Sequence, residues 1–150
     1  MRMTPPSHSV LKCWARFDGY VRESLNRILG SNLTEQQWVQ AQLPVAMGGT
    51  GLRSPAEHSS AAYLGSYLDS ESRIHQVLEK AEYHLDPDRA LGQYSTQVGE
   101  PEPLDIAQLA GEGQKVLSLR VDMRKRDVFI ETLETGPGCC LLAFSMQEAG

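Results

Sequence analysis

The sequence has little that would hold a metal, form a disulfide or anchor the chain in a membrane. It contains three cysteines, Cys13, Cys139 and Cys140, and an odd set with two adjacent members favours a reducing compartment over a disulfide framework. None of the four histidines has a cysteine or histidine at zinc-site spacing, so we expect no metal. No apolar run could cross a bilayer, and residues 1–14 lack the apolar segment of a signal peptide. We therefore expect an intracellular protein, nuclear or cytoplasmic, with no membrane partner.

Aromatic residues are also scarce, at 7%, whereas apolar residues make up 41% of the 150 positions, enough for one modest aliphatic core. The net charge of −5 argues against a general polyanion binder. The charge is uneven, however. Residues 1–30 carry five basic and two acidic side chains, a net of +3, whereas residues 69–115 carry four basic and ten acidic ones, a net of −6. Any contact with nucleic acid should therefore involve the first segment.

Apolar residues recur at helical spacing and almost never alternate, which predicts an all-α fold. The first helix is expected over residues 9–29, capped by Ser7 or Ser9 and ended by Gly30 in a left-handed conformation. Its apolar stripe consists of Val10, Trp14, Phe17, Val21, Leu25 and Ile28.

Capping signals predict the next two helices. Thr34 and Gln37 have the spacing of a capping box, so a second helix should start at Thr34, turn Trp38 and Ala41 inward and stop at Pro44. A third helix should begin with Ser54 as N-cap, Pro55 in the first position and Glu57 completing a second box, and it should pack through a short apolar group. That group is Ala61, Ala62, Tyr63 and Leu64.

Helical spacing continues into the second half of the chain. A fourth helix is expected over residues 70–85, and Asp86-Pro87 should start a short one that ends near Tyr94. The inward residues of the fourth are expected to be Ile74, Val77, Leu78 and Ala81. Residues 95–103 have a linker's composition, and a short helix ended by Gly111 should follow. The last helix is expected over 114–134, and its stripe should contain Val116, Met123, Ile130 and Leu133.

These elements predict an irregular bundle of five or six helices with a glycine-rich loop between helices and flexible linkers. The expected organisation is a helical segment over residues 1–94, a linker with room for a short helix over 95–113, and a C-terminal helix and tail over 114–150.

The most unusual stretch is LPVAMGGTGLRS, residues 43–54, with three glycines in four positions. A Walker loop needs a lysine that is missing here, and a dinucleotide loop needs another glycine order after a strand. We therefore expect no cofactor, although Arg53 and the following helix N-terminus could hold one phosphate. The simpler interpretation is a structural loop, in which Gly48, Gly49 and Gly51 let the chain turn tightly after Pro44.

The sequence shows no catalytic constellation, so we do not expect an enzyme. Ser54, Glu57 and His58 lie close together, but Ser54 and Glu57 are better used as a helix cap. Cys13, beside Trp14, is expected in the core rather than as a nucleophile.

The basic run RVDMRKRD, residues 120–127, is expected to form a solvated, salt-bridged helix face. Asp122 and Arg126 have the spacing of a helical ion pair, which would absorb part of the charge. A contact between this run and nucleic acid is the less favoured alternative.

Four motifs in a fixed order carry a family resemblance. MRMTPP is followed by FDGYVRESLNRILG, then QWVQAQLPVAMGGTGLRS, then SSAAYLGS. This series resembles the segment just downstream of the polymerase core in reverse transcriptases of non-long-terminal-repeat retrotransposons. In that family a Leu-Pro and a Gly-Gly-x-Gly-Leu signature recur in the thumb region, and here they are Leu43-Pro44 and residues 48–52. The resemblance is strong over residues 1–68, weak over 69–113 and moderate from 114 onward.

The resemblance implies a thumb-and-connector fragment without catalytic activity. The family's catalytic aspartates bind two metal ions from an aromatic-x-Asp-Asp motif, and no Asp-Asp pair occurs in these 150 residues. The fragment would help to hold an RNA or DNA primer–template duplex through its phosphates, beside the missing polymerase core or another protein. The expected phosphate contacts are Arg16, Arg22, Arg27 and Arg53. The alternative is a small stand-alone helical module, derived from such an element, that binds a partner protein through the exposed stripe of its first helix.

Overall fold

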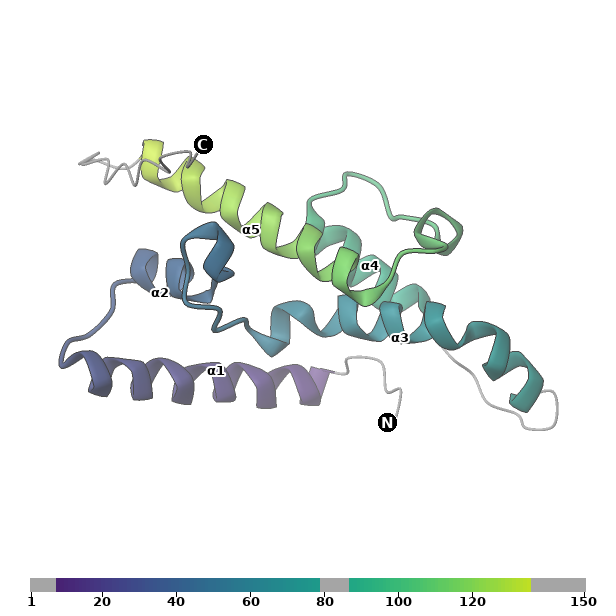
Figure 1. Cartoon of the computed structure of the whole chain (residues 1–150), viewed down its shortest axis with the longest axis horizontal. Helices are drawn as coiled ribbons and strands as arrows, with labels where there is room; N and C mark the ends of the chain where they lie inside the picture. The colour runs from purple at the N-terminus through teal and green to yellow at the C-terminus, as the bar shows by residue number, and fades with distance from the viewer. Residues whose placement is uncertain (1–7, 79–86, 136–150) are drawn as a thin grey trace, which may run out of the picture.

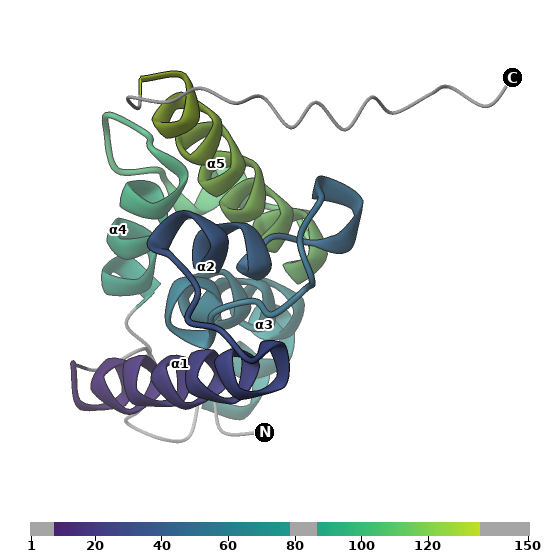
Figure 2. The same cartoon turned by 90° about the vertical axis from the view of Figure 1, so that its left-hand side faces the viewer.

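The computed structural model describes residues 8–78 and 87–135, and within these ranges every regular element is a helix. The prediction of an all-α fold is therefore confirmed. The elements are α1 (His8–Leu29), α2 (Glu35–Gln42), the 3-10 turn η1 (Val45–Met47), α3 (Pro55–Leu78), α4 (Pro87–Val98), the 3-10 turn η2 (Ile106–Leu109) and α5 (Gln114–Thr135). Figure 1 shows α1 along one side, α3 through the middle and α5 along the opposite edge. The turned view in Figure 2 places α2 between α1 and α5.

The predicted helix caps are present. Thr34 Oγ1 accepts from the Gln37 N–H at 3.2 Å, and Gln37 Oε1 accepts from the Thr34 N–H at 2.9 Å, which completes the first capping box. Gly30 has φ 66°, and the N–H groups of Gly30 and Ser31 bond to Arg27 O and Asn26 O, the double closure of a Schellman motif. Ser54 Oγ accepts from the Glu57 N–H at 3.3 Å, while the Glu57 carboxylate, which a second box would direct back to Ser54, bonds to Lys125.

The glycine-rich loop after Pro44 is the tight turn that the sequence predicts. Gly48 and Gly51 have φ values of 83° and 80°, which side chains other than glycine rarely adopt. At Gly49 the reason is space, because a Cβ there would lie 2.0 Å from Leu43 O. The loop thus folds back on the end of α2, and only glycine fits where the backbones meet.

Two helix boundaries differ from the prediction. The third and fourth expected helices form a single helix, α3, which runs without a break through residue 70. The helix continues there because the sequence around residue 70 contains neither proline nor glycine. Helix α4 continues past Tyr94 to Val98, and Ser95, expected in the linker, is buried with its Oγ bonded to Leu91 O one turn earlier. Several predictions fall outside the described residues or side chains: the inward side chains Ile74, Val77, Leu78 and Ala81, and the caps Ser7 and Asp86. Ser9 lies within α1, so it is not the cap of that helix.

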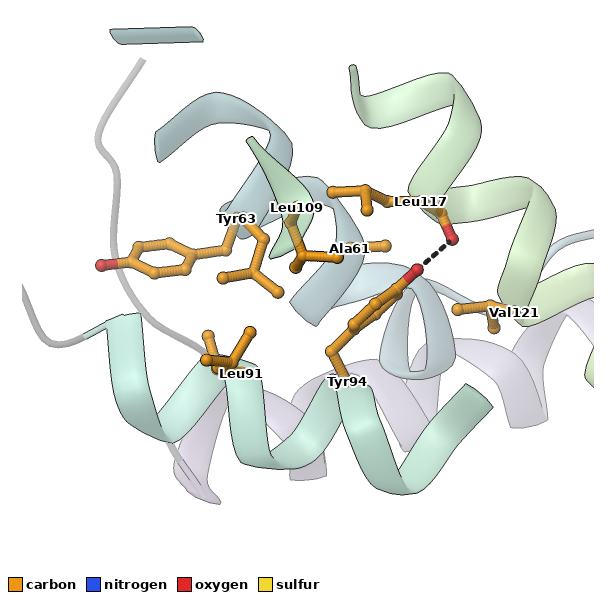
Figure 3. Packing of buried hydrophobic residues seen from close by; sticks show 9 residues of the cluster. Ala61, Tyr63, Leu91, Tyr94, Leu109, Leu117 and Val121 are labelled. Carbon is orange, nitrogen blue, oxygen red and sulfur yellow. Dashed lines mark hydrogen bonds between the residues drawn. The ribbon is translucent and has the colours of Figure 1, made fainter. Parts of the chain in front are cut away.

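The main core lies where α3, α4 and α5 meet (Figure 3). Ala61, Tyr63 and Leu64 of α3 are buried as predicted, whereas Ala62 is half-buried. The complete cluster is Ala61, Tyr63, Leu64, Ala90, Leu91, Tyr94, Leu109, Leu117 and Val121. Leu109 comes from η2, so the segment between α4 and α5 contributes to the core rather than merely joining two helices.

The apolar stripe predicted on α5 does not face the core. Val116, Met123, Ile130 and Leu133 are 37–48% exposed, whereas Leu117 and Val121 are 0% and 4% exposed. The helix has apolar residues on two faces, and their spacing alone does not say which face meets the body of the protein.

Helix α1 is also more exposed than its stripe predicts. Phe17 and Ile28 are 54% and 80% exposed, while Trp14, Val21 and Leu25 are half-buried. Cys13, expected in the core, is exposed. Among the described residues, the contacts of α1 lie on the side that meets α2 and α3, and part of its apolar stripe faces solvent.

The buried hydroxyl of Tyr94 makes the stability of the core depend on pH. Its side chain is fully buried and its hydroxyl donates to Leu117 O at 3.2 Å (Figure 3). Burial raises the pKa of Tyr94 above its ordinary value of 10.0, although nearby Arg120 opposes the shift. The stability that the neutral hydroxyl contributes is therefore complete below the ordinary pKa and is lost as the pH rises through the higher folded value.

We expect Tyr94→Phe to lower the free energy of unfolding by about 1 kcal/mol at neutral pH, the value of one hydrogen bond. The difference from the parent chain should shrink as the pH rises above about 10. Urea unfolding of both chains over a pH series measures this. A stability difference that stays constant at alkaline pH would show that ionisation of Tyr94 does not cause the loss of stability there.

Candidate functional site

A buried carboxylate lies where α5 crosses the start of α3. Asp122 is 1% exposed, and Arg53 Nη2 lies 2.6 Å from its Oδ2 while His58 Nε2 lies 3.0 Å from its Oδ1. The expected ion pair of Asp122 with Arg126 on a solvated face is therefore wrong. The physical reason is that Leu117, Val121 and Asp122 occupy the side of α5 that packs on the body of the protein.

The ring of His58 lies between two oxygen atoms. Its Nδ1 is 3.0 Å from Ser54 O, and its Nε2 is 3.0 Å from Asp122 Oδ1. A carbonyl oxygen and a carboxylate are both hydrogen-bond acceptors, so the ring can donate to either of them, and its tautomer sets which nitrogen donates. The arrangement thus places the guanidinium of Arg53 and the ring of His58 on the two oxygens of one buried carboxylate.

The same residues do not form a nucleophile and base. Ser54 Oγ donates to Asp18 Oδ2 of α1 at 2.5 Å, and His58 contacts the Ser54 carbonyl instead of its hydroxyl. A serine nucleophile needs its hydroxyl within reach of the base. The geometry therefore supports a structural role for Ser54 and His58, in agreement with the use of Ser54 as a helix cap.

A second polar contact lies nearby on the same side of α5. Lys125 Nζ donates to Glu57 Oε2 at 2.5 Å and to Gln42 Oε1 at 2.6 Å, so it joins α5 to α3 and α2. We call Arg53, Glu57, His58, Asp122 and Lys125 together the α3–α5 polar network. Sequence reasoning missed the roles of Asp122 and Lys125. Lys125 follows Val121 by four positions and so shares its helical face, whereas Asp122 lies about 100° from Val121 and its spacing gives no such signal.

The structure separates the four predicted phosphate contacts into two pairs. Arg22 bonds to Glu35 at 2.6 Å and to Leu33 O at 2.9 Å, and its guanidinium lies 5.9 Å from the centre of the Trp38 ring. Arg22 thus joins α1 to α2, just as Arg53 joins the loop to α5. Arg16 and Arg27 are exposed, and Arg16 Nη2 lies 3.3 Å from the Tyr20 hydroxyl.

Arg16 and Arg27 share one face of α1 with two other residues. At 100° per residue, Lys12, Arg16, Tyr20 and Arg27 fall within about 80° of the helix circumference. All four are exposed, Tyr20 by 59%, and Glu23 lies among them. We call Lys12, Arg16, Tyr20 and Arg27 the α1 outer strip. It lies on a helix that forms one edge of the molecule (Figures 1 and 2).

A groove of about 760 Å³ runs between α2, α4 and α5. Its apolar lining includes Val39, Val121, Val128 and Phe129, and its polar lining includes Glu57 and Lys125, which bond to each other. The acidic and basic side chains that line the groove balance in number, and no free polar groups converge on one point. The chemistry of the lining therefore does not define a ligand.

Two further properties bear on the class of site. No three histidine, cysteine, aspartate or glutamate side chains gather to hold a metal within residues 8–78 and 87–135. None of the helices described above is long and apolar enough to cross a membrane.

No protein-family model, curated protein or solved structure matches this chain. The function has to be argued from the residues and contacts given above.

Proposed function

We propose that the chain is a non-catalytic part of a retroelement reverse transcriptase, its thumb and connector region, and that it helps to hold a primer–template duplex. The support is the order of the motifs over residues 1–68 and the exposed basic face on α1. The observation that carries the proposal is the α1 outer strip, which presents three cations and one aromatic ring on one side of one helix.

The dimensions of the strip suit a nucleic-acid backbone. Lys12 and Arg27 are fifteen residues apart, which is about 22 Å along a helix. That length corresponds to about six base-pair steps of a duplex. The chain as a whole carries −5, so contacts at the strip work against the repulsion of the remaining surface. Binding should therefore be weak and strongly dependent on salt.

We expect the triple variant Lys12→Gln, Arg16→Gln, Arg27→Gln to bind an RNA–DNA duplex more weakly and with a smaller salt dependence. Each phosphate contact contributes about 0.9 to the slope of log affinity against log salt, so the slope should fall by about 2 to 3. Fluorescence anisotropy with a labelled duplex over a salt series measures both quantities. The loss should be similar for unrelated duplex sequences, because phosphate contacts carry no sequence information.

The matched control removes three exposed cations from α5, with Lys115→Gln, Arg124→Gln and Arg126→Gln. This control changes the net charge equally and should leave the slope close to that of the parent chain. Equal losses in both triple variants would mean that net charge, rather than the α1 outer strip, determines binding. Arg22 stays in both variants because its bond to Glu35 holds α1 against α2.

A helical module that binds another protein is the second candidate. It is favoured by exposed apolar side chains, which include Phe17 and Ile28 on α1 and a longer series on α5.

A further inference from the structure

Helix α5 carries an exposed apolar series with the spacing of a coiled coil. Its five members are 37–48% exposed and are Val116, Leu119, Met123, Ile130 and Leu133. Successive members are three, four, seven and three residues apart, which places them at a and d positions of a heptad repeat. Arg126 occupies the remaining position of this series, between Met123 and Ile130. We call these six residues the α5 seam. It extends for about 26 Å along the helix.

The seam is a second apolar face on a helix that is already held in place. Leu117, Val121 and Asp122 anchor α5 to α3 on another side of the helix, so its fold does not depend on the seam. In Figure 1 α5 forms one edge of the molecule. A stripe of this length that faces solvent on a folded helix is typical of a helix–helix interface.

The charges beside the seam favour a second copy of the same helix in antiparallel orientation. In a parallel pair the flanking positions would place Lys115 beside Arg120 of the other copy, and two-fold symmetry would make this like-charged contact twice. In an antiparallel pair Arg120 would lie beside Asp127 of the other copy, and two-fold symmetry makes this contact twice. Arg120 and Asp127 are both exposed.

The antiparallel register also accommodates Arg126. The core layers would then join residue 116 to 133, 119 to 130, and 123 to 126 of the other copy. Arg126 would face Met123, along which its apolar stem can pack while its guanidinium reaches water. In the parallel register the two Arg126 side chains would face each other in the core.

We propose that the α5 seam binds the seam of a second copy of this chain, antiparallel, to form a two-fold dimer. The interface is short and contains one charged layer, so the dimer should be weak, with a dissociation constant of about micromolar order. It uses neither α1 nor the α1 outer strip, and it is independent of duplex binding.

Sedimentation equilibrium of the full chain over a concentration series tests the dimer. The expected mass rises from 16.6 kDa toward twice that value. The variant Leu119→Glu, Ile130→Glu should weaken association at least tenfold, because the two layers that join residues 119 and 130 would bury like charges. Val128→Glu is the matched control, since Val128 is 40% exposed on the same helix but lies off the seam. A chain that stays monomeric throughout, or equal weakening by Val128→Glu, would overturn the proposal.

The orientation has its own test. Asp127→Lys should weaken an antiparallel dimer, because it places lysine beside Arg120 of the other copy. It should leave a parallel dimer nearly unchanged, because Asp122, the residue nearest to position 127 in that arrangement, is buried against Arg53 and His58 of its own chain. Adding Arg120→Glu should restore antiparallel association. Arg120 also pairs with Glu112 of its own chain, so circular dichroism must first confirm that each variant is folded. Association that Asp127→Lys leaves unchanged or strengthens would reject the antiparallel arrangement.

Discussion

Replacement of Asp122 by alanine is expected to lower the free energy of unfolding by about 3 kcal/mol. The carboxylate is 1% exposed and lies within 3.0 Å of both Arg53 and His58. Its removal leaves the ring of His58, whose side chain is only 13% exposed, without the acceptor that lies 3.0 Å from its Nε2. Arg53 is 45% exposed and can turn toward water, which is why we expect the lower end of the usual cost.

Denaturant unfolding measures this loss, and Asp127→Ala is the control on the same helix. Asp127 is exposed, so its replacement should change stability by no more than about 0.5 kcal/mol. Arg53→Gln combined with Asp122→Ala should cost less than the sum of the single variants, because both remove the same contact. Additive losses would show that Arg53 and Asp122 act separately.

Gly65→Val is expected to destabilise the fold by about 3 kcal/mol or more, the upper range for overpacking. A Cβ at Gly65 would lie 2.6 Å from the Cα of Gln114, which is the first residue of α5. Backbone cannot move aside as a side chain can, so α3 and α5 would have to separate. That separation would disturb the contacts of Leu64 and Leu117, both fully buried.

Gly92→Ala is the matched control for Gly65, because Gly92 also lies inside a helix but a Cβ there would meet nothing within 4 Å. Alanine is the better helix former, so this variant should gain up to about 1 kcal/mol. Thermal unfolding of the two variants should therefore shift in opposite directions. A stable Gly65→Val chain would mean that the α3–α5 crossing is looser than described.

Features that depend on neighbouring residues could be predicted from the sequence. The capping box of Thr34 and Gln37, the left-handed Gly30 and the start of α3 after Ser54 each follow from contacts within a few positions. The tight loop at Gly48 and Gly51 follows from the conformational freedom of glycine.

Features that depend on residues far apart in the chain could not be predicted from the sequence. The partner of Arg53 is Asp122, and a local rule instead assigned Asp122 to Arg126 one turn away. The buried face of α5 could not be chosen from the sequence, because Leu117 and Met123 belong to two apolar stripes and only the position of α3 decides between them. The bond of Arg22 to Glu35 could not be predicted either, because the charge of Arg22 is visible in the sequence whereas its position beside Glu35 is not.

The attachment of α1 gives the fold two levels of protection against hydrogen exchange. Its contacts with the rest of the described chain include the bonds of Arg22 to Glu35, Asn26 to the Leu33 N–H and Asp18 to Ser54, and none of the core cluster at α3, α4 and α5 comes from α1. Opening α1 therefore exposes little of that core and should require less free energy than global unfolding. The amide protons of α1 would exchange first, and the α1 outer strip would lie on the segment that can most easily change its orientation to meet a duplex.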